Sequence, residues 1–387
     1  MIKKMCNMLP IQCYLELTSS CNLRCTHCFA SAGNDKISFI TFEDAIRVVK
    51  AACDMGVFWL NISGGEPLLH PNIFEIIKYT TTVPLVTSLL TNGILWDDNI
   101  ISKLLEVDPN RKTKIQISLD GTNATEFGCH RNVSEKDVEK IVSTIGKLRH
   151  LGFVVTCLHV ASPNTVSHTI KTLYFALDEL LVDAFQIVPF FPTGRGSVFI
   201  DKINDFWQQW NKLVVDLTMI KKNRKEKKLK NNFKIGVFTP YELALPLDYA
   251  DMHDEILNTW EIDFDDYAMF KKISRRTVYC EAARTELTVS ADFKLYPCVA
   301  SLRTKYCGGD LKGKNIQEIF NSSDVFIWFR SIHETISKME PCNMCRYVKV
   351  CAGGCRLASN AILNTSLLPD PRCPIVYKYM VSRGLLC

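Results

Sequence analysis

The sequence contains no hydrophobic run long enough to cross a membrane and begins with no secretory signal. Of its 387 residues, 47% are hydrophobic, but no stretch approaches the roughly 20 consecutive apolar residues that a membrane-spanning helix needs. The first ten residues, MIKKMCNMLP, have no continuous apolar segment of the kind found in signal peptides. The sequence therefore predicts a cytoplasmic protein that has no membrane partner.

Strong charge of either sign is missing too. The 46 Lys and Arg residues nearly balance the 41 Asp and Glu residues, which leaves a net charge of +5. This charge is too weak to indicate a nucleic acid partner. Tandem repeats and low-complexity segments are also absent. The length suffices for two domains, or for one barrel with an appended module.

Cysteine, by contrast, is abundant, with 17 residues. This odd number rules out complete disulfide pairing, and in a reduced cytosol closely spaced thiols usually bind metal. Cys21, Cys25 and Cys28 follow the pattern C-x3-C-x2-C. Zinc sites usually take cysteines in pairs. Three thiolates on one short loop suit three irons of a four-iron cluster and leave the fourth iron without a protein ligand.

Apolar strand patterns alternate with helical patterns over the first half of the chain. The strand patterns cover residues 11–17, 56–63, 84–93, 114–121, 153–162 and 184–190. The helical patterns cover residues 41–56, 71–80, 97–107, 134–152 and 164–181. This alternation predicts an α/β fold with a parallel sheet. Six strands are too few for a closed eight-stranded barrel, so we expect a partial (β/α)6 TIM-like barrel, or an open sheet, with its chemistry on the loops after the strands.

The remaining sequence divides into two further parts. Residues 197–275 lose the alternation and read as a bridging segment, with a Lys-rich run followed by acidic residues. Residues 276–387 form a small cysteine-rich domain, in which 285–298 predict a strand, a turn and a strand, and 315–330 predict helix. We therefore predict domains at 1–196, 197–275 and 276–387.

The first cysteine motif, CNLRCTHC over residues 21–28, resembles the signature of the radical S-adenosylmethionine (radical SAM) superfamily. The tail cysteines are similar to those of its SPASM extension: Cys280, Cys298, Cys342, Cys345, Cys351, Cys355 and Cys373. Together the two resemblances cover nearly the whole chain. They imply an iron-sulfur enzyme in which S-adenosylmethionine chelates the open iron of a 4Fe-4S cluster. One electron then cleaves it to methionine and a 5′-deoxyadenosyl radical, which takes a hydrogen atom from the substrate.

The resemblance also implies the residues that contact the cofactor. The GGEP segment after the second strand would bind the amino group of S-adenosylmethionine. TNG and SLDG, after the third and fourth strands, would lie near its methionine part and ribose. The implied contacts are His27, near the adenine, with Gly64, Gly65, Glu66, Pro67, Asn92, Ser118 and Asp120. Ordinary turn chemistry is the alternative interpretation of these segments.

By the same resemblance, the tail holds two auxiliary 4Fe-4S clusters. One would be bound by Cys280, Cys298 and Cys355, and the other by Cys342, Cys345, Cys351 and Cys373. The first set is one ligand short. Some relatives have an extra cysteine between the first two, but residues 281–297 contain none. Either Cys307 supplies the fourth ligand, or one iron is open to substrate.

Several other positions carry weaker predictions. Family members usually have Gly where this chain has Phe293, so we expect the hairpin turn to avoid a positive φ. The segment 129–131 (Cys-His-Arg) follows the fourth strand on the catalytic side, so it is either a substrate contact or an ordinary loop. Arg195 in PTGRG is a candidate to hold a substrate carboxylate. Five cysteines belong to no motif, and we expect most of them to be small buried hydrophobic residues: Cys6, Cys13, Cys53, Cys157 and Cys387.

SPASM proteins mostly modify ribosomal peptides or proteins, which makes a peptide or protein the expected substrate. A haem-pathway decarboxylase and a sulfatase maturase that forms formylglycine are the alternatives. A zinc-stabilised interaction protein is the alternative from another class. Because the first strand pattern begins near residue 11, we expect no leader-binding domain before it, so a separate recognition protein is a possible partner. Flavodoxin or ferredoxin would supply electrons.

Overall fold

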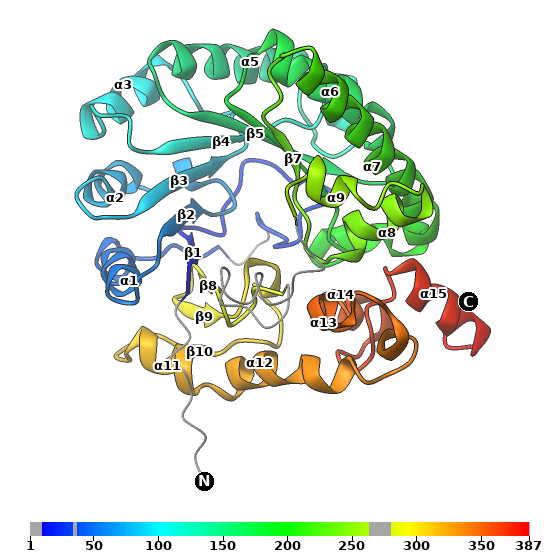
Figure 1. Ribbon diagram of the computed structural model, residues 1–387. Helices are drawn as coiled ribbons and strands as arrows, with labels where there is room; N and C mark the ends of the chain where they lie inside the picture. The colour runs from blue at the N-terminus through cyan, green and yellow to red at the C-terminus, as the bar shows by residue number, and fades with distance from the viewer. Residues whose placement is uncertain (1–9, 34–36, 263–279, 387) are drawn as a thin grey trace.

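The computed structural model of the protein describes residues 10–33, 37–262 and 280–386. Its strands form one ten-stranded sheet in the order β10-β9-β8-β1-β2-β3-β4-β5-β6-β7 (Figure 1). The strands are β1 Gln12–Glu16, β2 Trp59–Ser63, β3 Val86–Thr91, β4 Lys114–Ser118, β5 Val155–Ala161, β6 Ala184–Pro189, β7 Phe233–Ile235, β8 Glu286–Val289, β9 Lys294–Tyr296 and β10 Gly309–Asp310.

The six predicted strands are confirmed as β1 to β6, each parallel to the next. Two more strands extend this parallel sheet, and the sequence pattern missed both of these pairings. The three residues of β7 pair in parallel with β6. At the other edge, β8 pairs in parallel with β1, with Gln12 opposite Glu286. The barrel sheet therefore continues into the cysteine-rich tail.

Helices cover the outer face of this curved sheet (Figure 1). Those of the first 262 residues are α1 Phe42–Asp54, α2 Ile73–Thr80, α3 Asp98–Val107, α4 Ala124–Gly128, α5 Glu135–His150, α6 Thr169–Tyr174, α7 Ile203–Glu226, α8 Tyr241–Tyr249 and α9 Glu255–Asn258. Side chains cap several of these helices. Thr41 caps α1, while Ser134 and Asp137 form a capping box at α5. No helix of the described part of the chain is long and apolar enough to span a membrane.

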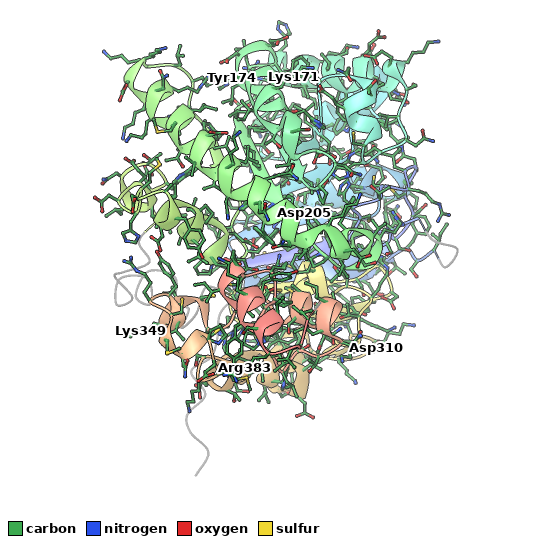
Figure 2. All side chains as sticks on the ribbon, turned by 90° about the vertical axis from the view of Figure 1, so that its right-hand side faces the viewer. Lys171, Tyr174, Asp205, Asp310, Lys349 and Arg383 are labelled. Atoms are coloured by element: carbon green, nitrogen blue, oxygen red, sulfur yellow. The ribbon has the colours of Figure 1, made fainter. Side chains whose placement is uncertain are left out.

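The tail packs at the end of the sheet where β8 lies. Its helices are α11 Ile316–Ser322, α12 Asp324–Ile336, α13 Val348–Cys351, α14 Arg356–Leu363 and α15 Pro374–Ser382. In the turned view of Figure 2, the tail residues Lys349 and Arg383 lie at the opposite end of the molecule from Lys171 and Tyr174 of α6. The predicted division at 196 and 275 stays a prediction, and the sheet itself runs across both boundaries.

The hairpin between β8 and β9 differs from its prediction. Phe293 has a φ of 58°, so it adopts the left-handed conformation that we expected the turn to avoid. Its N–H donates to the carbonyl of Ser290 at 2.9 Å, and the N–H of Ser290 donates to Lys294 at 3.0 Å. A three-residue hairpin loop needs a left-handed residue at this place. Burial of the Phe293 ring, which is 3% exposed, offsets a cost of about 1–2 kcal/mol.

Candidate iron-sulfur and cofactor site

The three-cysteine loop begins directly after β1, at the carboxyl end of the sheet. Cys25 is buried, and Cys21 and Cys28 are half-buried. The pKa of the Cys21 thiol is raised to about 11, chiefly by burial and in smaller part by Cys25 and Cys28. The thiols therefore lie close enough to act on one another electrostatically. Ligation to iron would lower this raised pKa, because the ion stabilises the deprotonated thiolate.

Arg195 holds this loop in place. Its Nε donates to the carbonyl of Cys25 at 2.8 Å and its Nη1 to that of Ala32 at 2.9 Å. Its backbone N–H donates to the carbonyl of Cys28 at 3.0 Å. A Cβ on the neighbouring Gly194 would lie 2.2 Å from the carbonyl oxygen of Phe29. The PTGRG segment therefore packs directly on the cysteine loop. Arg195 therefore binds carbonyls of the chain itself through Nε and Nη1, and its contact with a substrate carboxylate stays a prediction.

The GGEP segment lies against the start of the same loop. A Cβ on Gly64 would stand 2.8 Å from the carbonyl oxygen of Thr18, and one on Gly65 would stand 2.2 Å from that of Ser20. The N–H of Gly65 donates to Thr18 at 2.7 Å. Pro67 is buried at the start of the short 3-10 turn that follows. The two glycines thus permit close backbone packing between the loops that follow β1 and β2, which is a geometric reason for their presence. Contact between this segment and the cofactor amino group stays a prediction.

Glu66 connects three of the predicted segments. Its side chain is 0% exposed and accepts from the hydroxyl of Thr91 at 2.8 Å, the N–H of Asn92 at 2.8 Å and the N–H of Leu68 at 3.3 Å. Burial raises the pKa of Glu66 to about 7, although these hydrogen bonds act in the opposite direction. The amide of Asn92 in turn donates to Asn22 of the cysteine loop at 2.8 Å. Glu66 and Asn92 therefore fix the loops after β1, β2 and β3 relative to one another.

Asp120 reaches the cluster loop through an arginine. Its carboxylate is buried and accepts from Nε of Arg131 at 2.6 Å and from the N–H of Val160 at 3.0 Å. Although burial acts to raise the pKa of Asp120, Arg131 holds it well below its ordinary value. Nη1 of Arg131 lies 3.7 Å from Sγ of Cys25. The ion pair thus places a buried positive charge beside one cysteine thiol. Ser118 ends β4 and is half-buried.

Arg131 contacts the cysteine loop, and the sequence indicated it only weakly, as a member of the segment 129–131. Its neighbour His130 lies next to His27, with ring centroids 4.1 Å apart. Nδ1 of His27 is buried and has no hydrogen-bond partner among the described residues. Burial lowers the pKa of His27 well below its ordinary value, so its imidazole is neutral. A buried polar atom without a partner is where a ligand would bind, which fits the predicted place of the adenine.

The first auxiliary set is brought together in space. Burial raises the pKa of the Cys298 thiol well above its ordinary value, and Glu286, Cys355 and Cys280 raise it further. Cys280 also raises the pKa of Cys355. These three cysteines lie far apart in the sequence, so only the fold brings them together. Their grouping matches the set that the resemblance implied.

The second auxiliary set is also assembled. Burial raises the pKa of Cys351, and Cys373, Cys342 and Cys345 raise it further. All four line one small apolar cavity. No group of three His, Cys, Asp or Glu side chains within the described residues is close enough to hold a single metal ion. A 4Fe-4S cluster instead takes one thiolate at each of its irons, so the donors and their grouping fit clusters.

A buried ion-pair network supports the two tail sites. Asp370 pairs with Arg372 at 2.8 Å, and Arg372 pairs with Glu242 of α8 at 3.3 Å. Asp370 also accepts from the N–H of Cys355 at 3.0 Å and from the hydroxyl of Tyr241 at 2.9 Å. The network therefore ties a ligand of the first auxiliary set to the helix that packs on the barrel.

The cysteines outside the ligand sets fall into different environments. Cys13 and Cys157 are 0% exposed, as predicted for small core residues, while Cys53 is only partly buried. Cys6 and Cys387 lie outside the described residues. Cys307 packs with Tyr296 in a small apolar cluster that includes Cys28. The position of Cys307 is therefore between the tail and the three-cysteine loop.

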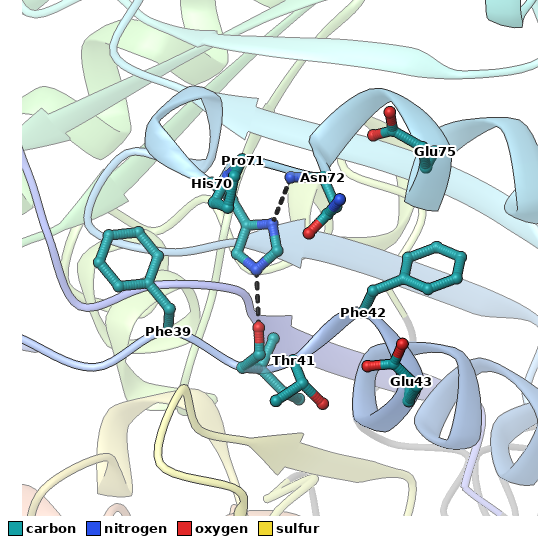
Figure 3. A pocket seen from close by; sticks show the side chains of 9 residues that line it. Phe39, Thr41, Phe42, Glu43, His70, Pro71, Asn72 and Glu75 are labelled. Atoms are coloured by element: carbon teal, nitrogen blue, oxygen red, sulfur yellow. Dashed lines mark hydrogen bonds between the residues drawn. The ribbon is translucent and has the colours of Figure 1, made fainter.

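A pocket of about 580 Å³ lies beside the site, where α1 and α2 begin (Figure 3). His70 stands in its wall, with Nε2 2.8 Å from the carbonyl oxygen of Ile40 and Nδ1 accepting from the N–H of Asn72 at 3.2 Å. None of the predicted site residues lines this pocket. It is therefore separate from the cluster and cofactor residues.

Comparisons with known proteins agree with this arrangement. Residues 15–176 match the model of the Radical SAM superfamily, and residues 280–346 match SPASM, an iron-sulfur cluster-binding domain. The AdoMet-dependent heme synthase of Methanosarcina barkeri is 28% identical over 359 residues, covering 92% of this chain and 94% of that protein. The mycofactocin maturase of Mycolicibacterium smegmatis is 25% identical over 366 residues, covering 94% and 82%.

The structure of Streptococcus suis SuiB bound to the precursor peptide SuiA is similar with a TM-score of 0.72 at 17% identity, covering 95% of this chain and 76% of that one. This likeness extends over both the barrel and the tail. The two family matches set aside a zinc-stabilised interaction protein in favour of an iron-sulfur enzyme. The chain combines a radical SAM domain with a C-terminal SPASM domain.

Proposed function

We propose that this radical SAM enzyme modifies a side chain of a ribosomal peptide or protein. The observation that carries the proposal is that four arginines near the cysteine sites are held by groups of the chain itself. Arg131 and Arg372 pair with buried carboxylates. Arg195 donates to loop carbonyls, and Arg303 pairs with Glu16 and donates to the carbonyl of Ala30. These four cations are therefore engaged by the chain itself, whereas a porphyrin substrate presents several carboxylates that need cationic partners.

The cofactor would supply a 5′-deoxyadenosyl radical when S-adenosylmethionine and the radical cluster are bound. We assign that cluster to Cys21, Cys25 and Cys28. Arg131 places positive charge at Cys25, and Arg195 fixes the carbonyls of the same loop. These contacts orient the ligands before the cofactor binds, which lowers the reorganisation that the reaction requires.

The further site assignments belong to the same proposal. Gly64, Gly65, Glu66 and Pro67 would line the amino end of the cofactor, and Asn92 its methionine part. Ser118 and Asp120 would lie at the ribose, and His27 at the adenine. The seven tail cysteines would hold two auxiliary clusters that accept or pass on an electron. Flavodoxin or ferredoxin would deliver electrons in the cytoplasm, and a separate protein would recognise the leader of the peptide.

The relatives support two candidates. SuiB in complex with its precursor peptide and the mycofactocin maturase favour a peptide substrate. The heme synthase of Methanosarcina barkeri, which the chain matches over 94% of its length, favours a porphyrin substrate. The second candidate predicts oxidative loss of propionate carboxyl groups as carbon dioxide.

Anaerobic turnover with mass spectrometry distinguishes these candidates. Reconstituted protein is supplied with S-adenosylmethionine, dithionite and either a short peptide encoded beside its gene or an iron porphyrin that carries propionates. A crosslink or oxidation would remove two hydrogens from the peptide, one as an atom and one as a proton, and an auxiliary cluster held by the tail cysteines would supply the acceptor for the remaining electron. We expect this mass loss in the peptide. Loss of carbon dioxide from the porphyrin, with no change in the peptide, would overturn the proposal.

A further inference from the structure

We propose that the carboxylate of Glu286 is the fourth protein ligand of the auxiliary cluster held by Cys280, Cys298 and Cys355. This inference rests on the proposed cluster assignment. Its test remains distinct, because iron and sulfide content tests the cluster, whereas Glu286 variants test one ligand of it.

The β8–β9 hairpin brings Glu286 and Cys298 to the same end of its paired ladder. Thr288 pairs with Tyr296, and Val289 pairs with Leu295, in antiparallel fashion. The two residues lie just beyond the last of these pairs, where the N–H of Glu286 donates to the carbonyl of Glu281 at 3.1 Å and the N–H of Cys298 donates to Oγ of Ser301 at 3.3 Å. Neither backbone group bonds to the other strand, so the side-chain contacts decide where the carboxylate lies.

Contacts of the Glu286 side chain place its carboxylate next to Cys298. Oε1 of Glu286 accepts from the N–H of Val299, the residue that follows Cys298, at 2.7 Å. Glu286 acts electrostatically on both Cys298 and Cys280, and it raises the pKa of each thiol. The carboxylate therefore lies near two of the three proposed ligands. A carboxylate has about four lone-pair directions, so the hydrogen bond from the N–H of Val299 and the interaction with the Thr288 side chain leave others for a metal.

The surroundings of Glu286 leave its charge without a cation. The residue is 7% exposed, and none of the groups that act on its carboxyl is positively charged. Among the described residues, Glu286 forms no ion pair with Lys, Arg or His. Buried carboxylates in proteins are usually paired or bound to a metal ion. An iron centre would supply the missing positive charge.

Cys307 is the competing ligand, and the structure places it elsewhere. Its thiol lies by the hydroxyl of Tyr296, whose pKa is raised first by burial and then by Cys307. It packs in the apolar cluster of Ala30, Tyr296 and Leu302, with Cys28 nearby. Glu286, by contrast, acts directly on two of the three cysteines. The two residues therefore make separable predictions for the spectrum of this cluster.

The experiment uses the full-length chain with Cys21, Cys25 and Cys28 replaced by Ala, so that only the auxiliary clusters contribute signals. Paramagnetic resonance and Mössbauer spectra are recorded after anaerobic reconstitution, with and without 2-mercaptoethanol. Glu286→Ala, Glu286→Gln and Glu286→Cys are compared with Glu318→Gln, a matched control at an exposed glutamate of α11, and with Cys307→Ala. Glu286→Cys keeps the test valid should the other two lose the cluster, because a thiolate can restore ligation.

We expect one iron of the parent protein to show oxygen ligation, and its signal not to respond to the thiol. Glu286→Ala and Glu286→Gln should change the auxiliary signal and make it respond to 2-mercaptoethanol, and Glu286→Cys should give an all-thiolate spectrum with unchanged iron content. Glu318→Gln and Cys307→Ala should match the parent. Spectra identical to the parent in all three Glu286 variants would overturn the inference. So would a thiol-responsive parent, or a changed signal in Cys307→Ala alone.

Discussion

The three-cysteine loop and the cysteine-rich tail bind the same kind of metal group, but they assemble their ligands in different ways. The loop carries Cys21, Cys25 and Cys28 within eight residues and is held from outside by Arg131 and Arg195. The tail collects its ligands from segments far apart in the chain and supports them with a buried ion-pair network. Local spacing therefore defines the first ligand set, whereas tertiary structure defines the others.

Removal of one loop thiolate gives the largest expected effect. Cys25→Ala should abolish cleavage of S-adenosylmethionine, because the radical cluster loses one of three ligands, while the tail clusters remain. Formation of 5′-deoxyadenosine measures the first outcome and the auxiliary spectrum the second. Cys53→Ala, a cysteine outside the ligand sets, serves as the control. Retained 5′-deoxyadenosine formation in Cys25→Ala would show that the loop is not the radical site.

In the tail, by contrast, we expect loss of a buried ion pair to lower the stability of the fold. Asp370→Asn leaves Arg372 buried with a weakened set of partners, and loss of one partner of a buried pair costs about 3–5 kcal/mol. Asp292→Asn is the matched control, since its pair with Lys294 is exposed and such pairs contribute about 0–1 kcal/mol. Denaturant unfolding of the reconstituted protein measures both. Equal stabilities of the two variants would contradict the structural role of the network.

Variants of Arg131 test how much the three-cysteine loop depends on contacts with residues outside it. We expect Arg131→Gln to reduce cleavage of S-adenosylmethionine by about 10–100-fold, the usual cost of losing a partner of a metal ligand. Arg131→Lys should recover part of this loss, because it keeps the charge beside Asp120. Arg111→Gln changes an exposed arginine and should have no effect. An auxiliary spectrum altered to the same degree as the loop signal would mean general misfolding instead.

The smallest effect is expected at Cys307. Cys307→Ala should keep near-normal cleavage of S-adenosylmethionine without substrate and leave the auxiliary paramagnetic signal unchanged, because its thiol packs beside Tyr296. Iron content should also match the wild type. A lower iron content would show that Cys307 is a ligand after all.

The same contrast explains what the sequence could predict. The six strands β1 to β6 follow from local patterns and are confirmed in the fold. The loop cysteines also follow from a local pattern, and their role as cluster ligands stays a prediction. The pairing of β8 with β1 joins residues such as Gln12 and Glu286, and no local pattern reveals such a distant contact. The positive φ of Phe293 depends on hairpin length and ring burial together. Arg131 gained its significance only when the fold brought it within 3.7 Å of Cys25.

Metal analysis of anaerobically reconstituted protein tests the central claim, that two differently assembled regions both hold 4Fe-4S clusters. The claim predicts roughly twelve irons per chain with matching inorganic sulfide, if all three clusters have four irons. Replacement of Cys21, Cys25 and Cys28 by Ala should remove about a third of both. Stoichiometric zinc without inorganic sulfide would contradict the account.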